Sequence, residues 1–409
     1  HQHTHNRYYK DYMAYDLGVH AIKGLLTKTA LDPTVVDTVI MGNVIQEVKC
    51  PNVAREAALA AGIPNSVPCH TVVQACISSN QAIANGAAMI QSGQAEVIIA
   101  GGTETFSDVP IRFSKPMRKK FIASMKDKTP MAKLQRITKG LKLAHLAPEP
   151  PAIANFATGE VMGHSSDRLA AKFGVSREAM DKFALRSHQN AARATEEGIF
   201  KDEISPVEGH TTDNGIKGDS TLEKLSSLRP AFVRPHGTHT AANSSFLTDG
   251  AAATLIMSEE KALELGYQPK AYIAHTTFVG VDPFEELLLG PAYAIAKLLK
   301  SANMTMKDID VWEIHEAFAG QVLANLAALE SDSFSKENFG YDGKVGSVPE
   351  EKLNIHGGSL SIGHPFGATG SRLTLTAANR MIREDGKTAM IAACADSGLA
   401  VGMILKRYQ

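Results

Sequence analysis

The amino-acid sequence predicts a layered α/β protein made of two similar halves, because one strand–helix–strand pattern occurs twice. In the first half, an Ala-rich stretch without proline over residues 76–92 favours a helix, and an apolar run over residues 97–100 predicts a buried strand after it. Near the C-terminus, a helical stretch over residues 365–382 precedes a second apolar run over residues 390–393. We expect the functional site where the ends of the two equivalent strands meet.

The spacing inside the two units agrees with a repeat. Gly93 precedes Gly101 by eight residues, and Gly386 precedes Cys394 by eight residues. A proline-rich stretch at residues 147–151 marks the segment before it as an insertion. The expected division is an N-terminal half made of residues 1–110 and 152–265, an inserted segment of residues 111–151, and a C-terminal half of residues 266–409.

The composition excludes several classes of protein. Of 409 residues, 44% are hydrophobic and 21% are charged, unlike a disordered chain or a coiled-coil rod. The net charge of −1 argues against nucleic-acid binding by the whole chain, and no apolar run reaches the ~18 residues of a membrane span. Four cysteines are too few to cross-link a chain of this size, so we expect reduced thiols in an intracellular compartment. The opening residues lack the apolar core of a secretory signal, and His1, His3 and His5 are expected to be a flexible tail without a metal site.

The segment from Ile111 to His145 concentrates positive charge. It contains eight Lys and three Arg against one acidic residue, Asp127, which gives a net charge of +10. Pro116 stands where a helix can begin and Pro130 interrupts it, so two short helices are expected.

Apolar residues recur at helical spacing in both of these helices. They are Met117, Phe121 and Met125 in the first, and Leu134, Ile137 and Leu141 in the second. Such a face beside charge of one sign fits docking on an anionic membrane surface or on an acidic partner, whereas a charge run alone is typical of a solvated hairpin. Both interpretations stay open. The residues expected to form the surface are Lys115, Arg118, Lys119, Lys120, Lys126, Lys133, Arg136 and Lys139.

Cys76 is the first candidate for chemistry, because it lies where a strand meets the Ala-rich helix. The positive end of a helix dipole favours a thiolate, and a thiolate is a nucleophile. The commoner role of a lone cysteine is that of a small buried apolar residue, and Cys69 fits that role better. Cys50, before Pro51, is expected in a turn.

The segment from Asn354 to Gly370 is the most specific stretch of the chain. It contains five glycines, two histidines and a proline directly before a helix, and glycine density of this kind permits close approach of the backbone to a ligand. Pro365 restricts the residue before it, so His364 is expected to be held as the base that a thiol nucleophile needs. A phosphate-binding loop is the alternative, but the Lys-Ser/Thr pair of a P-loop is missing.

Two further residues lie at expected strand ends. His315 follows a strand and suits hydrogen-bond donation to a substrate carbonyl, because an HExxH metal motif fails at Ala319. Cys394 closes a buried strand on the side where α/β proteins bind ligands. Two cysteines and two histidines also suggest zinc, but no CxxC pair is present, so no metal is expected.

Taken together, these segments closely resemble the thiolase family, from about Asp16 to the C-terminus. The matching pieces are QACISSNQA around Cys76, AGGTETFS from Ala100, TAANSSFLTDGAA from Thr240, HEAFAGQ from His315, GGSLSIGHPFGATGSR from Gly357, and Cys394. HEAF stands where many thiolases have NEAF, and with MGHSSDRLA and the basic insertion it resembles the branch of mitochondrial long-chain 3-ketoacyl-CoA thiolases. The resemblance implies a five-layered α-β-α-β-α fold. It also implies thiolytic cleavage of medium- to long-chain 3-ketoacyl-CoA by CoA, the last step of fatty-acid β-oxidation, with no bound cofactor and CoA as co-substrate.

Carried over to this sequence, the resemblance implies a role for each site residue. Cys76 takes the acyl group as a thioester, His364 removes its proton, and Cys394 protonates the departing acetyl-CoA carbanion and later activates CoA. His315 and His364 form one oxyanion hole, and the backbone N–H groups of Cys76 and Asp396 form the second. The residues that match the CoA tunnel are Ser245, Ala241, Met162 and Arg229.

The same resemblance implies partners and a location. We expect a homodimer that joins an α subunit with enoyl-CoA hydratase and 3-hydroxyacyl-CoA dehydrogenase activities. This assembly would lie on the matrix face of the mitochondrial inner membrane, as a peripheral protein.

Two departures from the family pattern affect these expectations. Asp396 and Ser397 replace glycines of a C-terminal turn, and if the turn needs positive φ, Ser fits less comfortably than Asp. The first strand of the family, with its Arg-Thr-Pro-like segment, has no counterpart in residues 1–10.

Two alternatives of other kinds remain. One is a condensing 3-ketoacyl synthase, which also pairs a cysteine with two histidines but has no need for a second thiol such as Cys394. The other is a degenerate thiolase that serves as a scaffold or lipid-binding subunit, which the Asp396–Ser397 turn motivates and the presence of all four reactive side chains opposes.

Overall fold

The computed structural model describes residues 8–409, so the expected tail at His1, His3 and His5 lies outside the described residues. The first half of the chain forms α1 (Ala14–Thr29), β1 (Thr38–Gly42), α2 (Val53–Ala61), β2 (Cys69–Val72), α3 (Ser78–Gln91), β3 (Val97–Glu104), β4 (Arg112–Phe113), α4 (Lys115–Ser124), α5 (Pro130–Thr138), β5 (Pro148–Glu149), α6 (Met162–Lys172), α7 (Arg177–Glu196), α8 (Leu222–Ser226) and β6 (Gly250–Met257). The rest of the chain forms α9 (Glu259–Glu264), β7 (Ala271–Gly280), α10 (Gly290–Ser301), β8 (Val311–Ile314), α11 (Ala319–Glu330), α12 (Asp332–Phe334), α13 (Ser359–Ile362), α14 (Thr369–Arg383), β9 (Thr388–Ala395) and β10 (Leu399–Arg407).

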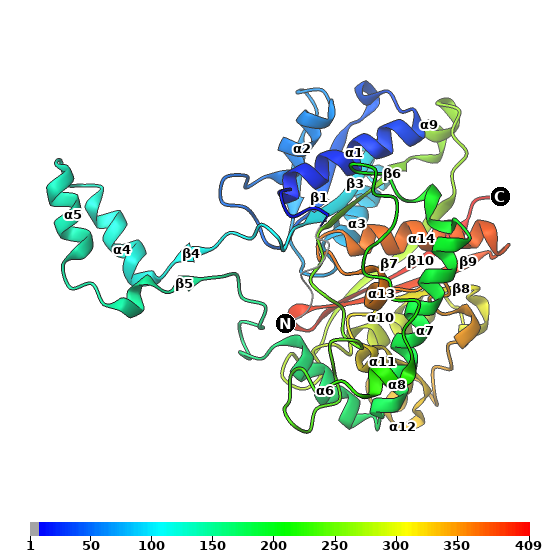
Figure 1. Cartoon of the computed structure of the whole chain (residues 1–409). Helices are drawn as coiled ribbons and strands as arrows, with labels where there is room; N and C mark the ends of the chain where they lie inside the picture. Colours follow the sequence, from blue (N-terminus) through cyan, green and yellow to red (C-terminus); the bar gives the residue numbers. More distant parts are fainter. Residues whose placement is uncertain (1–7) are drawn as a thin grey trace.

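Two four-stranded sheets organise the body of the molecule (Figure 1). The first has the order β2-β1-β3-β6 and the second the order β7-β10-β9-β8. In each sheet a pair of parallel strands, β1–β3 or β8–β9, is followed by an antiparallel neighbour, β6 or β10. The helix before the shared strand is α3 in one half and α14 in the other. The predicted internal repeat is therefore present in the structure.

In each sheet, side chains point alternately to an outer core and to a middle core that the two sheets share. This arrangement produces five layers. On β1, Val39 and Met41 pack toward α1 and α2, whereas Ile40 points to the layer of α3 and α14 between the sheets. On β9, Ile391 faces that same middle layer and Met390 faces the outer helices α10 and α11. This confirms the expected α-β-α-β-α arrangement, and it explains why both sheets have nearly continuous apolar strands.

The inserted segment projects from the body as an arm (Figure 1). Strands β4 and β5 pair antiparallel at its base, and α4 and α5 form the helical pair at its end. The two predicted helices are confirmed, with Pro116 and Pro130 each in the first turn of a helix. Within residues 8–409, the structure has no helix of the length and apolarity needed to span a membrane.

The apolar stripe predicted for the first helix of the arm is only partly correct. Met117 is buried in the hairpin, with 4% of its surface exposed, while Met125 is 79% exposed. Two of the eight expected basic surface residues are also paired within the arm: Arg118 with Glu149, and Arg136 in a bidentate pair with Asp127. Burial of Met117 and the ion pairs of Arg118 and Arg136 thus stabilise the hairpin itself.

Candidate active site

The four candidate side chains come from separate parts of the chain and lie in loops or near the ends of strands. Cys76 lies between β2 and α3, directly after Ala75, whose φ of 46° makes the sharp turn at this point. His315 follows the last residue of β8, and Cys394 lies in β9, one residue before its end. His364 is in the loop between α13 and α14, and its ring centroid lies 4.2 Å from that of His315. The structure therefore brings the two imidazoles together, and the two thiols lie near enough for Cys76 to raise the pKa of Cys394.

His364 has one ring nitrogen committed and one free. Its Nδ1 lies 2.7 Å from the hydroxyl of Thr369, and that hydroxyl donates to the carbonyl of Pro365 at 3.0 Å. A threonine has a single hydroxyl proton, so Thr369 must accept from Nδ1–H. Nε2 is then the unprotonated nitrogen. It is buried and has no partner among residues 8–409, as a base waiting for a proton would be.

His315 has the opposite tautomer. Arg372 donates to the hydroxyl of Ser359 at 3.1 Å, and that hydroxyl lies 3.1 Å from Nδ1 of His315. Within residues 8–409, Nδ1 of His315 is the only acceptor within reach of the Ser359 hydroxyl, so the proton of Ser359 goes to Nδ1, and Nε2 of His315 carries the N–H. This Nε2 is also buried without a partner in the described part of the chain. One imidazole is therefore arranged as an acceptor and the other as a donor.

Both imidazoles are neutral near pH 7. Burial, and then the positive charge of Arg372, lower the pKa of His364 to about 3. Burial, and then His364 and Arg372, lower the pKa of His315 well below its ordinary value. Neutral rings are what the two roles require, because a base needs a lone pair and a buried imidazolium would be costly.

The thiols are protonated in the free protein. Burial raises the pKa of Cys76 to about 12, the carboxylate of Asp396 adds to the rise, and the backbone N–H groups of Asp396 and Cys76 oppose it. Burial, and then the nearby Cys76, raise the pKa of Cys394 well above its ordinary value. Burial and the Asp396 carboxylate thus oppose the thiolate that the helix dipole was expected to favour at Cys76. Cys76 therefore depends on a base for activation.

The altered C-terminal turn does need positive φ, at Ser397 rather than at Asp396. Ser397 has a φ of 67° and is followed by Gly398 at 73°. The backbone N–H of Ser397 donates to the Asp396 carboxylate at 2.6 Å, and Asn155 donates to the same carboxylate at 2.8 Å. The N–H of Asp396 still donates toward the Cys76 sulfur, which lowers the pKa of that thiol. A backbone donor at Cys76 thus survives the loss of the family's glycines.

The four residues expected to bind CoA differ in their position relative to the reactive groups. Ser245 is nearest to the reactive group, because its N–H donates to the carbonyl of Ala317, two residues after His315. Met162 begins α6, and Ala241 is an exposed residue of the loop that leads to Ser245. Arg229 is exposed, and no contact in the described residues joins it to the thiols or imidazoles. Its assignment stays a prediction.

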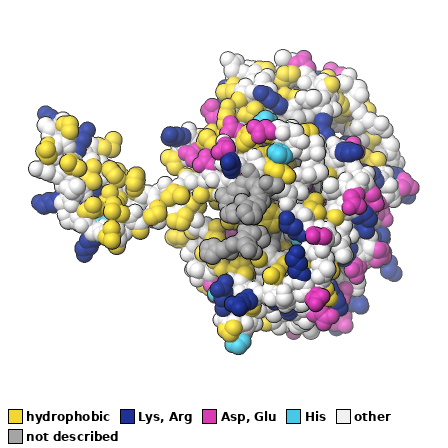
Figure 2. Space-filling view, in the orientation of Figure 1, with side chains coloured by type: hydrophobic (Ala, Val, Ile, Leu, Met, Phe, Trp, Pro, Cys, Tyr) yellow, Lys and Arg dark blue, Asp and Glu magenta, His cyan; other side chains and the backbone are white. Residues whose placement is uncertain are grey.

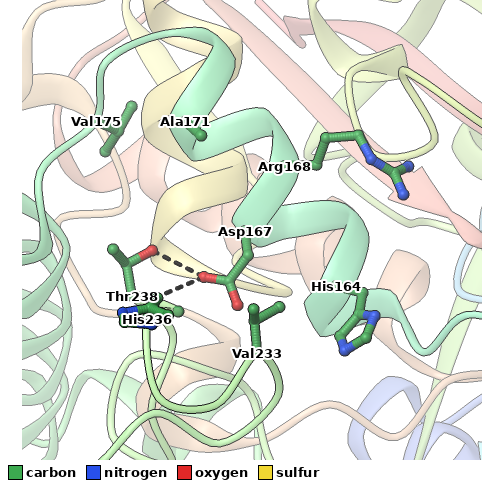
Figure 3. A pocket seen from close by; sticks show the side chains of 9 residues that line it. His164, Asp167, Arg168, Ala171, Val175, Val233, His236 and Thr238 are labelled. Carbon is green, nitrogen blue, oxygen red and sulfur yellow. Dashed lines mark hydrogen bonds between the residues drawn. The ribbon is translucent and has the colours of Figure 1, made fainter.

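A pocket of about 370 Å³ opens between α6 and the loop of residues 233–238 (Figure 3). Asp167 of α6 accepts from the N–H and the hydroxyl of Thr238, each at 2.8 Å, and fixes this loop. Burial opposes ionisation of Asp167, but hydrogen bonds from His239 and Thr238 lower its pKa to about 2. His164, Arg168 and His236 also line the pocket. It lies between the elements that carry Met162 and Ala241.

Several supporting residues were missed from the sequence. Ser359, Thr369 and Arg372 belong to the glycine-rich motif but were given no role, although hydroxyl and guanidinium groups near a functional histidine are a usable signal. Asn155 gave no signal, since its partner Asp396 is 241 residues away. Within residues 8–409, no group of three His, Cys, Asp or Glu side chains is arranged to hold a metal ion.

Comparison with known proteins identifies the family of the chain. The thiolase N-terminal domain model matches residues 2–260, and the thiolase C-terminal domain model matches residues 267–407. The chain therefore belongs to the thiolase family.

Individual relatives indicate which thiolases the chain is similar to. The chain is 53% identical over 404 residues to the mitochondrial trifunctional enzyme subunit beta of Bos taurus, covering 98% of this chain and 85% of the relative. It is 55% identical over 410 residues to a probable 3-ketoacyl-CoA thiolase of Caenorhabditis elegans, covering 98% and 90%. Among solved structures, human mitochondrial 3-ketoacyl-CoA thiolase in complex with CoA is similar, with a TM-score of 0.82, 32% identity, and coverage of 98% of this chain and 93% of that chain.

Proposed function

We propose that this protein is an acetyl-CoA C-acyltransferase that cleaves 3-ketoacyl-CoA of medium to long chain length with CoA. The observation that carries the proposal is the presence of two adjacent neutral imidazoles with opposite tautomers and of two protonated thiols. Thiolysis needs a base for a thiol, a donor for an enolate oxygen and a second proton carrier, and this site has one group for each. The relatives named as 3-ketoacyl-CoA thiolases support the same substrate class.

In the first half-reaction, the sulfur of Cys76 attacks C3 of the substrate while Nε2 of His364 takes the thiol proton. The C2–C3 bond then breaks, and the electron pair goes to C2 as the enolate of acetyl-CoA. The N–H of His315 donates to the developing enolate oxygen, and the thiol of Cys394 protonates C2. Acetyl-CoA leaves, with the acyl group held on Cys76 as a thioester.

In the second half-reaction, the Cys394 thiolate removes the proton of CoA, and the CoA sulfur attacks the thioester. The N–H groups of Cys76 and Asp396 donate to the oxyanion of this tetrahedral intermediate. Collapse expels the Cys76 thiolate, which recovers its proton from His364. Every proton is returned, so no cofactor is consumed and CoA is the only co-substrate.

Mass spectrometry of the protein after brief incubation with a long-chain 3-ketoacyl-CoA, without free CoA, tests this function. We expect release of acetyl-CoA and an acyl mass on the peptide that contains Cys76. Cys76→Ala should abolish the adduct, and Cys394→Ala should slow acetyl-CoA release. Unchanged turnover in either variant would contradict the mechanism, and absence of the adduct in the wild type would favour a scaffold subunit.

Binding of CoA is proposed along the path from α6 to Ser245. Met162, Ala241 and Ser245 would line it, and the basic side chains of the pocket in Figure 3 support entry of the phosphate-bearing end there. Arg229 is proposed to reach the same end. Replacing Ser245 by bulky Phe is expected to raise KM for CoA more than it lowers kcat.

A homodimer is proposed through the edge strand β2. Its only strand partner in the described residues is β1, so its other edge is open. Val73, directly after this strand, is 56% exposed and lies three residues before Cys76. A second copy on this edge would cover the approach to Cys76. Val73→Asp is expected to shift the sedimentation of the protein toward a monomer.

The arm is proposed to dock on an anionic membrane surface, as a peripheral contact with the matrix face of the mitochondrial inner membrane. Eight large apolar side chains on it are more than half exposed, namely Ile111, Phe113, Ile122, Met125, Met131, Leu134, Leu143 and Leu146. Basic side chains lie among the apolar ones on the face seen in Figure 2. Apolar insertion and attraction to anionic lipids together support binding, with ~1 kcal/mol for each basic residue near the surface.

Vesicles containing anionic lipid test this proposal. Binding is expected to weaken with salt and to be lost when residues 111–145 are deleted. A fourfold change of Lys119, Lys126, Lys133 and Lys139 to Gln should weaken it while the paired Arg118 and Arg136 keep the hairpin intact. Full binding by the deletion variant would refute membrane docking and leave an acidic partner as the occupant.

Association with an α subunit is proposed from the name of the mammalian relatives, which are described as a subunit of a trifunctional enzyme. The partner would have enoyl-CoA hydratase and 3-hydroxyacyl-CoA dehydrogenase activities. Co-elution of this chain with such a subunit from size-exclusion chromatography, at a fixed ratio, is the expected result. Separate elution at micromolar concentrations would contradict it.

A further inference from the structure

Asn155 connects the base of the arm to the turn beside Cys76. It lies in the tight turn between β5 and α6 and is 2% exposed. Its Nδ2 donates to Oδ1 of Asp396 at 2.8 Å and to Oγ of Ser397 at 3.1 Å. Its Oδ1 accepts the N–H groups of Ala157 at 3.0 Å and Thr158 at 2.9 Å. One side chain therefore closes its own turn and also holds another turn from the far end of the chain.

The turn that Asn155 holds is under strain and is close to the reactive sulfur. Ser397 has a φ of 67°, a conformation that glycine adopts freely and serine does not. The carboxylate of Asp396 works against a thiolate at Cys76, while the N–H of Asp396 works for it. Which effect prevails depends on how the turn is held, because rotation of the turn moves the carboxylate and the N–H together.

We propose that Asn155 is a positioning residue that replaces the glycines of this turn, by holding the Asp396 carboxylate and the Ser397 hydroxyl so that the N–H of Asp396 faces the Cys76 sulfur. The inference rests on the proposed function, because that N–H is the donor to the thioester oxygen. It adds a residue outside the family's motifs, and it assigns to Asp396 and Ser397 side-chain roles that two glycines could not fill. The altered turn was the main argument for a degenerate scaffold. Because Asn155 holds this turn through Asp396 and Ser397, that argument is weakened.

Asn155→Asp isolates the donor. The carboxylate still accepts from Ala157 and Thr158, so the local turn is kept, but Nδ2 is lost and two carboxylates face each other. We expect kcat to fall by about tenfold or more, with a smaller change in KM, because the lost geometry acts on the transition state. The pH dependence of Cys76 alkylation by iodoacetamide should move to higher pH.

Exchanging the two side chains, Asn155 and Asp396, tests whether the lost activity can be restored. Oδ1 of Asp396 accepts both from Asn155 and from the N–H of Ser397. In the double variant Asn155→Asp with Asp396→Asn, the repulsion between two carboxylates is removed, and the new amide at 396 can donate to the new carboxylate at 155 if its side chain rotates. We expect recovery of a part of the lost kcat and return of the alkylation profile toward that of the wild type. Asp396→Asn alone, which leaves Asn155 an oxygen to donate to, should keep the turn but move the alkylation profile to lower pH, because the charge that raises the pKa of Cys76 is removed.

The outcomes separate the two proposals. A wild-type kcat and alkylation profile in Asn155→Asp, or a folded double variant no better than the single one, would overturn the role of Asn155. Alkylation of Cys76 needs no turnover, so this result is independent of whether the wild type forms the acyl adduct, which tests the proposed function. If Asn155→Asp does not fold, Asn155→Ser takes its place, because the hydroxyl can still cap the Asn155 turn but is too short to reach Asp396.

Discussion

Thr369 Oγ1 lies 2.7 Å from Nδ1 of His364 and, by donating its own proton to Pro365, leaves that imidazole with a bare Nε2. Thr369 is the first residue of α14 and is 1% exposed, so neither water nor another described side chain competes for the bond. The acceptor tautomer of His364 is therefore a property of the loop, fixed before substrate arrives.

Thr369→Val keeps the shape of this residue and removes the hydroxyl. We expect kcat to fall ten- to a hundredfold, because about half or more of the His364 rings would then carry the proton on Nε2 or tilt away from Cys76. Steady-state thiolysis measures it. Thr374→Val, on the same helix and 5% exposed, is the matched control and should retain activity, since Thr374 donates only to the carbonyl of Gly370.

Ser359→Ala should impair the other imidazole. Without this hydroxyl, Nδ1 of His315 loses its hydrogen-bond donor, so the ring proton is no longer held on Nε2. Loss of one oxyanion donor costs ~3 kcal/mol, so kcat should fall by about a hundredfold at most with KM nearly unchanged. Ser361→Ala is the control, because Ser361 is equally buried in α13 and contacts Ser187 instead. Nitrogen NMR of the histidine rings should show a change of tautomer for His315 in the first variant alone.

Alkylation of Cys76 in the free protein should be slow at neutral pH and should rise steadily with pH. The thiol pKa of about 12 and the imidazole pKa of about 3 leave the pair uncharged, so the thiolate fraction grows about tenfold with each pH unit up to pH 9 or beyond. Peptide mapping after timed exposure to iodoacetamide gives the rate. A plateau between pH 6 and 8 would instead reveal a preformed thiolate–imidazolium pair.

Buried histidines should make the fold sensitive to acid. Burial, and then Lys217, lower the pKa of His188 to about 4, and its Nδ1 accepts from the N–H of Lys217 at 3.1 Å. Because the folded pKa lies below the unfolded value, its contribution to stability is complete above about pH 6.5 and is lost as pH falls toward 4.

His188→Asn tests this contribution, because the amide oxygen can take the place of Nδ1 without titrating. Between pH 7.5 and pH 5 the variant should lose ~2 kcal/mol less unfolding free energy than the wild type. Denaturant unfolding at both pH values measures the difference. Equal losses in the two proteins would show that His188 takes up its proton in the folded state as readily as in the unfolded one.

Much of the fold could be predicted from local patterns. The helix expected over residues 76–92 is α3, the helix over 365–382 is α14, and the strand over 390–393 is β9. These elements were accessible because period and composition are properties of a few consecutive residues. The arm could be predicted only in part. Its two helices were predicted, but burial of Met117 and pairing of Arg136 with Asp127 depend on how the two helices pack.

The reactive groups of the protein could be identified from local sequence, because Cys76, His315, His364 and Cys394 lie in motifs of consecutive residues. The protonation state of these groups depends on how distant parts of the chain pack. The protonated thiols follow from burial, and the two tautomers follow from hydroxyls that other elements bring to each ring. Asn155 and Asp396 meet across 241 residues. Hydrogen-bond partners at such separations are set by packing of layers, which no local pattern encodes.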